Sequence, residues 1–151
     1  MMMIQFQKGL LAFTLGLMCL LMVSPGTTSA HGTPTAKPVQ VFDIQAGKVV
    51  KTIENDQQFQ QYATDWLASV TGLSPQFTPE NKCGYVFRIP LEHPVTIKTG
   101  GITVSTTDVF LFYCPDKPAS LLVFDAGRKP YILAFKPDLK PFLRKVGLPA
   151  A

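Results

Sequence analysis

A continuous apolar stripe between residues 59 and 70 constrains the fold of this chain more than any other feature. Asn55 or Asp56 supplies an N-cap side chain, and Gly72 stands where a left-handed C-cap is wanted. A helix with such a stripe has to bury it, and the β-rich segments that follow offer the matching sheet. We therefore expect one long amphipathic helix packed on a sheet. The stripe has the i, i+3, i+4, i+7, i+8 and i+11 spacing of one helix face: Phe59, Tyr62, Ala63, Trp66, Leu67 and Val70.

Short segments rich in β-branched and aromatic residues flank this helix. Before it, residues 39–44 and 48–53 are expected to pair as a hairpin through a turn at Ala46 and Gly47. After it, the near-continuous apolar runs 108–114 and 120–125 are typical of strands buried on both faces, or covered by a helix on one face. The full set of strands expected after the helix is 83–89, 95–98, 102–105, 108–114, 120–125 and 131–135, with Gly100 and Gly101 turning one hairpin.

The chain is expected to end in a short helix that begins near Pro137 and stops at Gly147. Its apolar stripe is Leu139, Phe142, Leu143 and Val146. The order of hairpin, helix, antiparallel strands and short helix predicts an α+β domain with a meander-like sheet. This layout is similar to the cystatin-like and related helix-on-sheet architectures, although no family motif accompanies the similarity.

The first 30 residues have the three parts of a secretory signal peptide. Lys8 precedes an apolar run over residues 9–23, helix breakers follow, and small residues lead up to Ala30. The apolar run is shorter than the roughly 20 residues that span a membrane. We therefore expect cleavage after Ala30 and no transmembrane helix in the mature form. The protein would then be extracytoplasmic, either secreted, periplasmic or held at the cell surface.

The remaining residues predict one domain with a flexible leader. Residues 31–38 contain two prolines, a glycine and two threonines, which favour an exposed, irregular segment. Residues 39–151 are long enough to bury an ordinary hydrophobic core without a metal or an oligomer. The expected division is a signal peptide over 1–30, a leader over 31–38 and a single α+β domain over 39–151.

Two of the three cysteines are expected to form a disulfide. Cys19 lies inside the apolar run and would be lost on cleavage. Cys83 and Cys114 remain as an even pair in an oxidising compartment, which predicts a structural bridge worth on the order of 3–4 kcal/mol in the chain-entropy model. A metal or redox pair is the weaker interpretation because the spacing is not CxxC.

The sequence marks no catalytic residues. It lacks GxSxG and HExxH motifs, and its mature part has two histidines, His31 and His93. A small extracytoplasmic hydrolase would have to recruit His93 from a turn, so it is the last of three functional hypotheses. Four aspartates fall at strand ends, turns or a helix start, where turn and capping hydrogen bonds explain them: Asp108, Asp116, Asp125 and Asp138.

The second hypothesis is a copper-binding protein. Cleavage after Ala30 would make His31 the first residue, with its α-amino group and imidazole in one chelate ring. The imidazole of His93 would complete a three-nitrogen set, which suits copper. Against this, Gly32 and the residues after it form a flexible leader rather than a pinned strand. No other cofactor is indicated.

A basic segment near the C-terminus suggests an anionic partner. Residues 128–145 contain six basic residues and one acidic residue, Asp138, which gives this segment a net charge of +5. Cations near the end of the terminal helix also favour its dipole, so part of the segment has a structural explanation. A membrane surface or a cell-wall polymer would be the anionic partner, since an extracytoplasmic location disfavours nucleic acid. The six basic residues are Arg128, Lys129, Lys136, Lys140, Arg144 and Lys145.

The first hypothesis follows from the small size, the disulfide and the missing catalytic motifs. It is a secreted, non-enzymatic α+β module that binds a protein, a peptide or an anionic envelope component through its sheet edge or its loops. A protease-inhibitor role is one form of this hypothesis.

Overall fold

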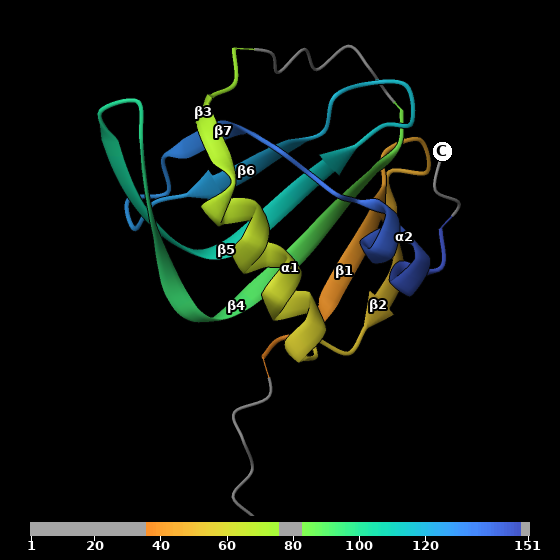
Figure 1. Ribbon diagram of the computed structural model, residues 1–151. Coiled ribbons are helices and arrows are strands. Elements are labelled where there is room, and N and C mark those ends of the chain that lie inside the picture. Colours follow the sequence, from red (N-terminus) through yellow and green to blue (C-terminus); the bar gives the residue numbers. More distant parts are fainter. Residues whose placement is uncertain (1–35, 76–82, 149–151) are drawn as a thin grey trace, which may run out of the picture. The chain divides into compact units, whose positions relative to one another are not determined.

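The computed structural model describes residues 36–75 and 83–148 (Figure 1). The chain divides into two units, residues 1–32 and 33–151, and all described residues belong to the second. The expected signal peptide and His31 therefore lie outside the described residues. Within the described part, no helix is long and apolar enough to cross a membrane.

The described residues form a seven-stranded antiparallel sheet with the order β2-β1-β4-β5-β6-β7-β3. Strands β4 to β7 are the expected meander, the β1–β2 hairpin extends it on one side, and β3 extends it on the other. The strands are β1 (Val39–Asp43), β2 (Lys48–Ile53), β3 (Val70–Leu73), β4 (Tyr85–Thr99), β5 (Ile102–Tyr113), β6 (Ser120–Phe124) and β7 (Pro130–Phe135).

Two short helices of the described chain, α1 (Gln57–Ala68) and α2 (Lys140–Val146), lie on one face of this sheet (Figure 1). Asp56 is the N-cap of α1, and its carboxylate accepts hydrogen bonds from the amides of Gln58 and Phe59 at 3.0 and 3.1 Å. The α2 helix ends at Gly147, whose φ of 79° is the left-handed cap expected from the sequence.

The prediction of one long helix is wrong. The α1 helix has 12 residues and is capped by Ser69, and the next residues form β3 instead of a last helical turn. Val70 lies opposite Phe135 at the edge of the sheet, so β7 offers backbone partners where the sequence suggested a helix end. Gly72 belongs to this strand and is not a C-cap. The domain is thus α+β in a coarse sense, an antiparallel sheet with two short helices and one disulfide.

The hairpin predicted at Gly100 and Gly101 is present but much longer than expected. Both glycines have positive φ, 53° and 79°, as a tight two-residue turn requires. The β4 strand runs for 15 residues and contains Pro90, where the sequence suggested separate strands. Its register with β5 shifts between Pro90 and Val95, and such an irregular stretch accommodates prolines, which cannot donate a ladder hydrogen bond.

The core is centred on Phe142 of α2. Its ring centroid lies 4.8 Å from that of Trp66 on α1, 5.9 Å from that of Phe59 and 5.0 Å from that of Phe87 on β4. These rings are buried, as are Ala63 and Leu67 of the predicted stripe. The stripe therefore faces the sheet as predicted, and α2 fills the space beside it.

The predicted disulfide is present between Cys83 and Cys114, with the Cα atoms 5.7 Å apart. It joins the chain just before β4 to the chain just after β5, where Tyr85 lies opposite Tyr113. Gly84 has a φ of 80°, and a Cβ at this position would lie 1.9 Å from the carbonyl oxygen of Tyr113. The close approach of the two strands beside the bridge therefore requires glycine.

Candidate functional site

The face of the sheet opposite the helices, called here the outer face, carries apolar side chains across most of its width. Phe110 lies opposite Arg88 on β4 and opposite Leu122 on β6, and Leu122 lies opposite Ile132 on β7. Neighbouring residues in each strand, such as Leu111, point to the helices and are buried. The outer face includes Gln40, Phe42, Val49, Thr52, Val86, Arg88, Asp108, Phe110, Phe112, Ser120, Leu122, Phe124, Pro130 and Ile132.

Several apolar side chains of the outer face are accessible to solvent. The accessible fractions are 37% for Phe42, 46% for Val49 and 36% for Phe124. The rings of Phe124 and Phe110 meet edge to face with their centroids 5.7 Å apart. An antiparallel sheet with one solvated face normally places polar residues there. Exposed apolar surface is characteristic of interaction sites, which makes the outer face a candidate site.

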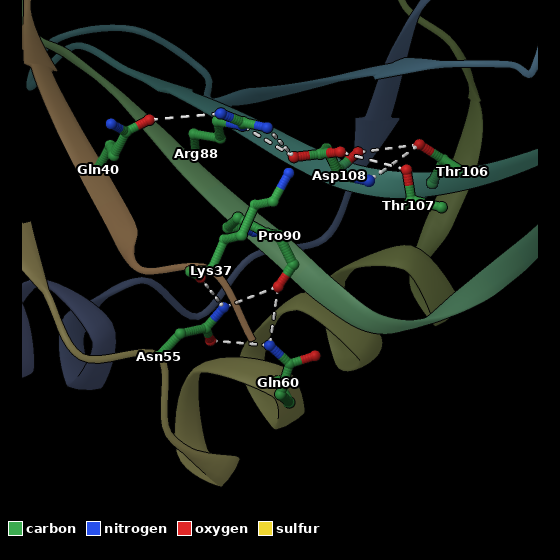
Figure 2. A network of polar contacts seen from close by, with 9 residues as sticks. All are labelled: Lys37, Gln40, Asn55, Gln60, Arg88, Pro90, Thr106, Thr107 and Asp108. Atoms are coloured by element: carbon green, nitrogen blue, oxygen red, sulfur yellow. Dashed lines mark hydrogen bonds and ion pairs between the residues drawn. The ribbon is translucent and has the colours of Figure 1, made fainter. Parts of the chain in front are cut away.

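The two charged residues of the outer face neutralise each other. The Nε and Nη2 atoms of Arg88 both lie 2.8 Å from Oδ1 of Asp108, on the neighbouring strand (Figure 2). Thr107 donates a hydrogen bond to the other carboxylate oxygen at 3.2 Å. The Arg88 guanidinium also lies 5.9 Å from the centroid of the Phe110 ring. The charges of Arg88 and Asp108 thus compensate each other within the outer face.

A second group of polar contacts in Figure 2 anchors the irregular part of β4 to α1. Asn55 is buried, and its side-chain nitrogen donates to the carbonyl oxygens of Lys37 at 2.9 Å and Pro90 at 2.8 Å. Its oxygen accepts from Gln60 at 2.7 Å, and the oxygen of Gln60 accepts from the amide of Glu92 at 3.0 Å. These bonds satisfy Asn55 completely, which identifies it as a structural residue.

Both edges of the sheet have features that oppose the addition of another strand. The β2 edge carries Lys48 and Lys51 and a register shift opposite Val41 and Phe42. Lys51 donates from Nζ to the carbonyl oxygen of Val146 at 2.5 Å, at the end of α2. The β3 edge has four residues and its own register shift. Edge lysines, bulges and short edge strands are features that natural proteins use against edge-to-edge pairing.

The basic residues predicted as a patch are distributed over separate parts of the fold. Arg128 and Lys129 precede β7 and Lys136 follows it, so a six-residue strand of roughly 20 Å separates them. Lys145 pairs with Asp56, with Nζ 2.6 Å from Oδ2. Lys140 and Arg144 are exposed on α2. The anionic partner remains a prediction.

The copper hypothesis also remains a prediction. His93 is exposed in the irregular stretch of β4, and His31 lies outside the described residues. Residues 36–75 and 83–148 contain no group of three or more histidine, cysteine, aspartate or glutamate side chains that could hold a metal ion.

Asp125, one of the four aspartates that the sequence places at turns and strand ends, stabilises the turn before β7. It accepts hydrogen bonds from the amide of Lys129 at 2.9 Å and from the hydroxyl of Tyr131 at 3.2 Å. The Lys129 amide, joined by the Tyr131 hydroxyl, outweighs desolvation and lowers the pKa of Asp125 below its ordinary value of 3.8. The carboxylate is therefore ionised at neutral pH, and its hydrogen bonds account for its position.

Sequence reasoning missed the outer face, although its signal was present. The runs 108–114 and 120–125 are apolar at both odd and even positions. This pattern predicts burial on both faces or cover by a helix on one face, whereas the structure leaves Phe124 of the second run accessible. The chain matches no family model, no curated protein and no solved structure.

Proposed function

We propose that this protein is a secreted, non-enzymatic binding module whose outer face receives an apolar, uncharged surface of a partner protein. The observation that carries the proposal is the row of apolar side chains on the face opposite both helices, with Phe42, Val49 and Phe124 accessible. Burying such side chains contributes roughly 25 cal/mol per Å² of apolar surface removed from water.

The paired charges of the outer face favour a protein or peptide partner over the anionic envelope component that the sequence also suggested. Arg88 and Asp108 are already paired with each other, so the outer face presents no unpaired cation to an anionic polymer or membrane. A complementary surface would be apolar and would leave this ion pair in place, because removing one partner of a desolvated pair is costly. A protein surface or an apolar peptide segment meets this requirement, and a cell-wall polyanion does not.

The structure of the sheet edges favours binding at the outer face over strand addition at an edge. Strand addition at β2 would have to overcome its lysines and its bulge, and β3 offers four residues. Packing of a partner against the outer face needs no change in the sheet. An extracytoplasmic location is supported by the signal-peptide pattern over residues 1–30 and by the disulfide.

The proposal is tested by photo-crosslinking from two positions of similar exposure. A photoreactive phenylalanine analogue replaces Phe124 on the outer face or, as the control, Leu73 on β3, which is 49% exposed and lies in the row of buried Leu133. In the extracytoplasmic fraction of the producing cells, a partner should crosslink from position 124 and not from position 73.

The crosslinked partner is then purified, and its affinity is measured for the wild type and for the Phe124→Glu and Leu73→Glu variants. Phe124→Glu should weaken binding at least tenfold, because it buries a charge in an apolar interface, whereas Leu73→Glu should leave the affinity unchanged. Equal crosslinking from both positions, or equal affinities of the two variants, would refute the proposal. Crosslinking between two copies of the chain would assign the outer face to self-association.

A further inference from the structure

A cleft of about 320 Å³ lies beside the end of β5, lined by no residue of the outer face. Its walls come from the end of β5, from the turn that leads to β6 and from the chain that enters α2. Pro115, Pro118 and Pro137 restrict the backbone of these walls. Leu139 and Leu143 add apolar surface. The volume lies at the lower end of the range of small-molecule sites, about 300–1,000 Å³.

Tyr113 lines this cleft and carries a hydroxyl group without a hydrogen-bond partner among the described residues. The residue is 9% exposed. Among these residues, no polar side-chain atom is both fully buried and without a partner. The Tyr113 hydroxyl is therefore not fully buried, while the side chain as a whole belongs to the core.

Two lysines line the same cleft from different segments. Lys117 belongs to the turn after β5, and Lys140 is the first residue of α2. Neither ammonium group forms an ion pair or a hydrogen bond with the described residues, in contrast to Lys51 and Lys145. Asp138 also lines the cleft, and its Oδ1 accepts from the amide of Lys140 at 3.3 Å. The charged lining is thus two cations and one anion.

We propose that this cleft binds a small organic carboxylate with a short apolar body. The carboxylate would accept hydrogen bonds from the Tyr113 hydroxyl and from the ammonium groups of Lys117 and Lys140. The apolar body would lie against the leucine side chains and the proline rings. This inference goes beyond the binding of a partner protein and does not depend on it.

The experiment is a titration of the isotope-labelled, purified protein, followed by the amide chemical shifts. Hexanoate is the probe, hexanol is the uncharged match, and inorganic phosphate is the anion without an apolar body. Hexanoate should produce saturable shifts confined to the residues of the cleft, and it should bind at least tenfold more tightly than hexanol or phosphate. The absence of saturable shifts, or equal affinity for hexanoate and either comparison probe, would overturn the proposal.

Variants test the assigned contacts. Tyr113→Phe keeps the buried ring and removes the hydroxyl, and Lys117→Met removes one ammonium group. Each should weaken hexanoate binding about tenfold, the loss of one hydrogen bond to a charged group. Lys98→Met, on the exposed side of β4, is the matched control and should leave the affinity unchanged. Unchanged affinity in both cleft variants, with their folds verified by circular dichroism, would show that the cleft is not the site.

Discussion

The Nζ atom of Lys145, on α2, lies 2.6 Å from Oδ2 of Asp56, the N-cap residue of α1. The other carboxylate oxygen of Asp56 accepts from the amides of Gln58 and Phe59. One side chain thus caps one helix and holds the other. Burial by itself would raise the pKa of Asp56, but the hydrogen bond from Lys145 and those from the amides outweigh it and bring the pKa below 3.8.

The free energy of unfolding should therefore fall in acid partly because of Asp56. A carboxyl group with a lowered pKa in the folded state stabilises the fold above its unfolded pKa, and this contribution is lost as the pH falls through the folded pKa. Urea unfolding measured from neutral pH to below pH 3.8 should show a smaller acid loss for Asp56→Asn, which keeps a capping side chain without charge. Equal acid losses in wild type and variant would contradict this assignment.

Removing the ring at the centre of the core should be costly. Phe142→Ala should lower the free energy of unfolding by about 3–5 kcal/mol, because it leaves a cavity among the rings that surround it, and Trp66→Ala should cost a similar amount. Phe124→Ala is the control, since Phe124 is exposed on the outer face, and it should cost about 1 kcal/mol or less. Urea unfolding monitored by circular dichroism measures all three. A small loss for Phe142→Ala would mean that this ring is not the packing centre.

A methyl group at Gly84 should destabilise the fold, whereas one at Gly72 should not. The Cβ of Gly84→Ala would meet the Tyr113 carbonyl oxygen in a backbone with positive φ, which should cost about 1–3 kcal/mol or more. At Gly72 a Cβ has no neighbour within 4 Å, so Gly72→Ala should stay within about 0.5 kcal/mol of wild type. Thermal unfolding under oxidising conditions compares the two variants. Equal melting temperatures of the two variants would contradict the close contact between Gly84 and the Tyr113 carbonyl group.

Asn55 should be more important for stability than an exposed polar residue of the same helix region. Asn55→Ala removes the side-chain donor to the carbonyl oxygens of Lys37 and Pro90 and one of the hydrogen-bond partners of Gln60, which should cost about 1–3 kcal/mol. Gln61→Ala removes an exposed contact with Asp65 and should cost about 0.5 kcal/mol or less. Hydrogen exchange should also show faster opening at Glu92 in Asn55→Ala. An unchanged exchange rate there would argue against the proposed anchoring of β4.

Local patterns predicted the elements whose signals lie within a few residues. The spacing from Phe59 to Leu67 is a helix face, Gly100 and Gly101 allow a tight turn, and Gly147 allows a left-handed cap. The pairing of Cys83 with Cys114, which the structure shows, was predicted from the two cysteines that lie outside the expected signal peptide. Local patterns failed at β3, because Val70 and Gly72 fit a helix end equally well until β7 is present to pair with them.

The sequence by itself determined an amphipathic helix, a largely antiparallel set of strands, a disulfide and an N-terminal signal-peptide pattern. Each of these depends on side-chain periodicity, backbone preference or residue count within one segment. The tertiary structure alone decided that both helices cover the same face of the sheet, which leaves Phe124 and Phe42 accessible, and that Tyr113 and Lys140 line one cleft. The physical reason is that an apolar strand residue is equally suited to either face, and the face that is buried depends on packing between segments distant in the chain.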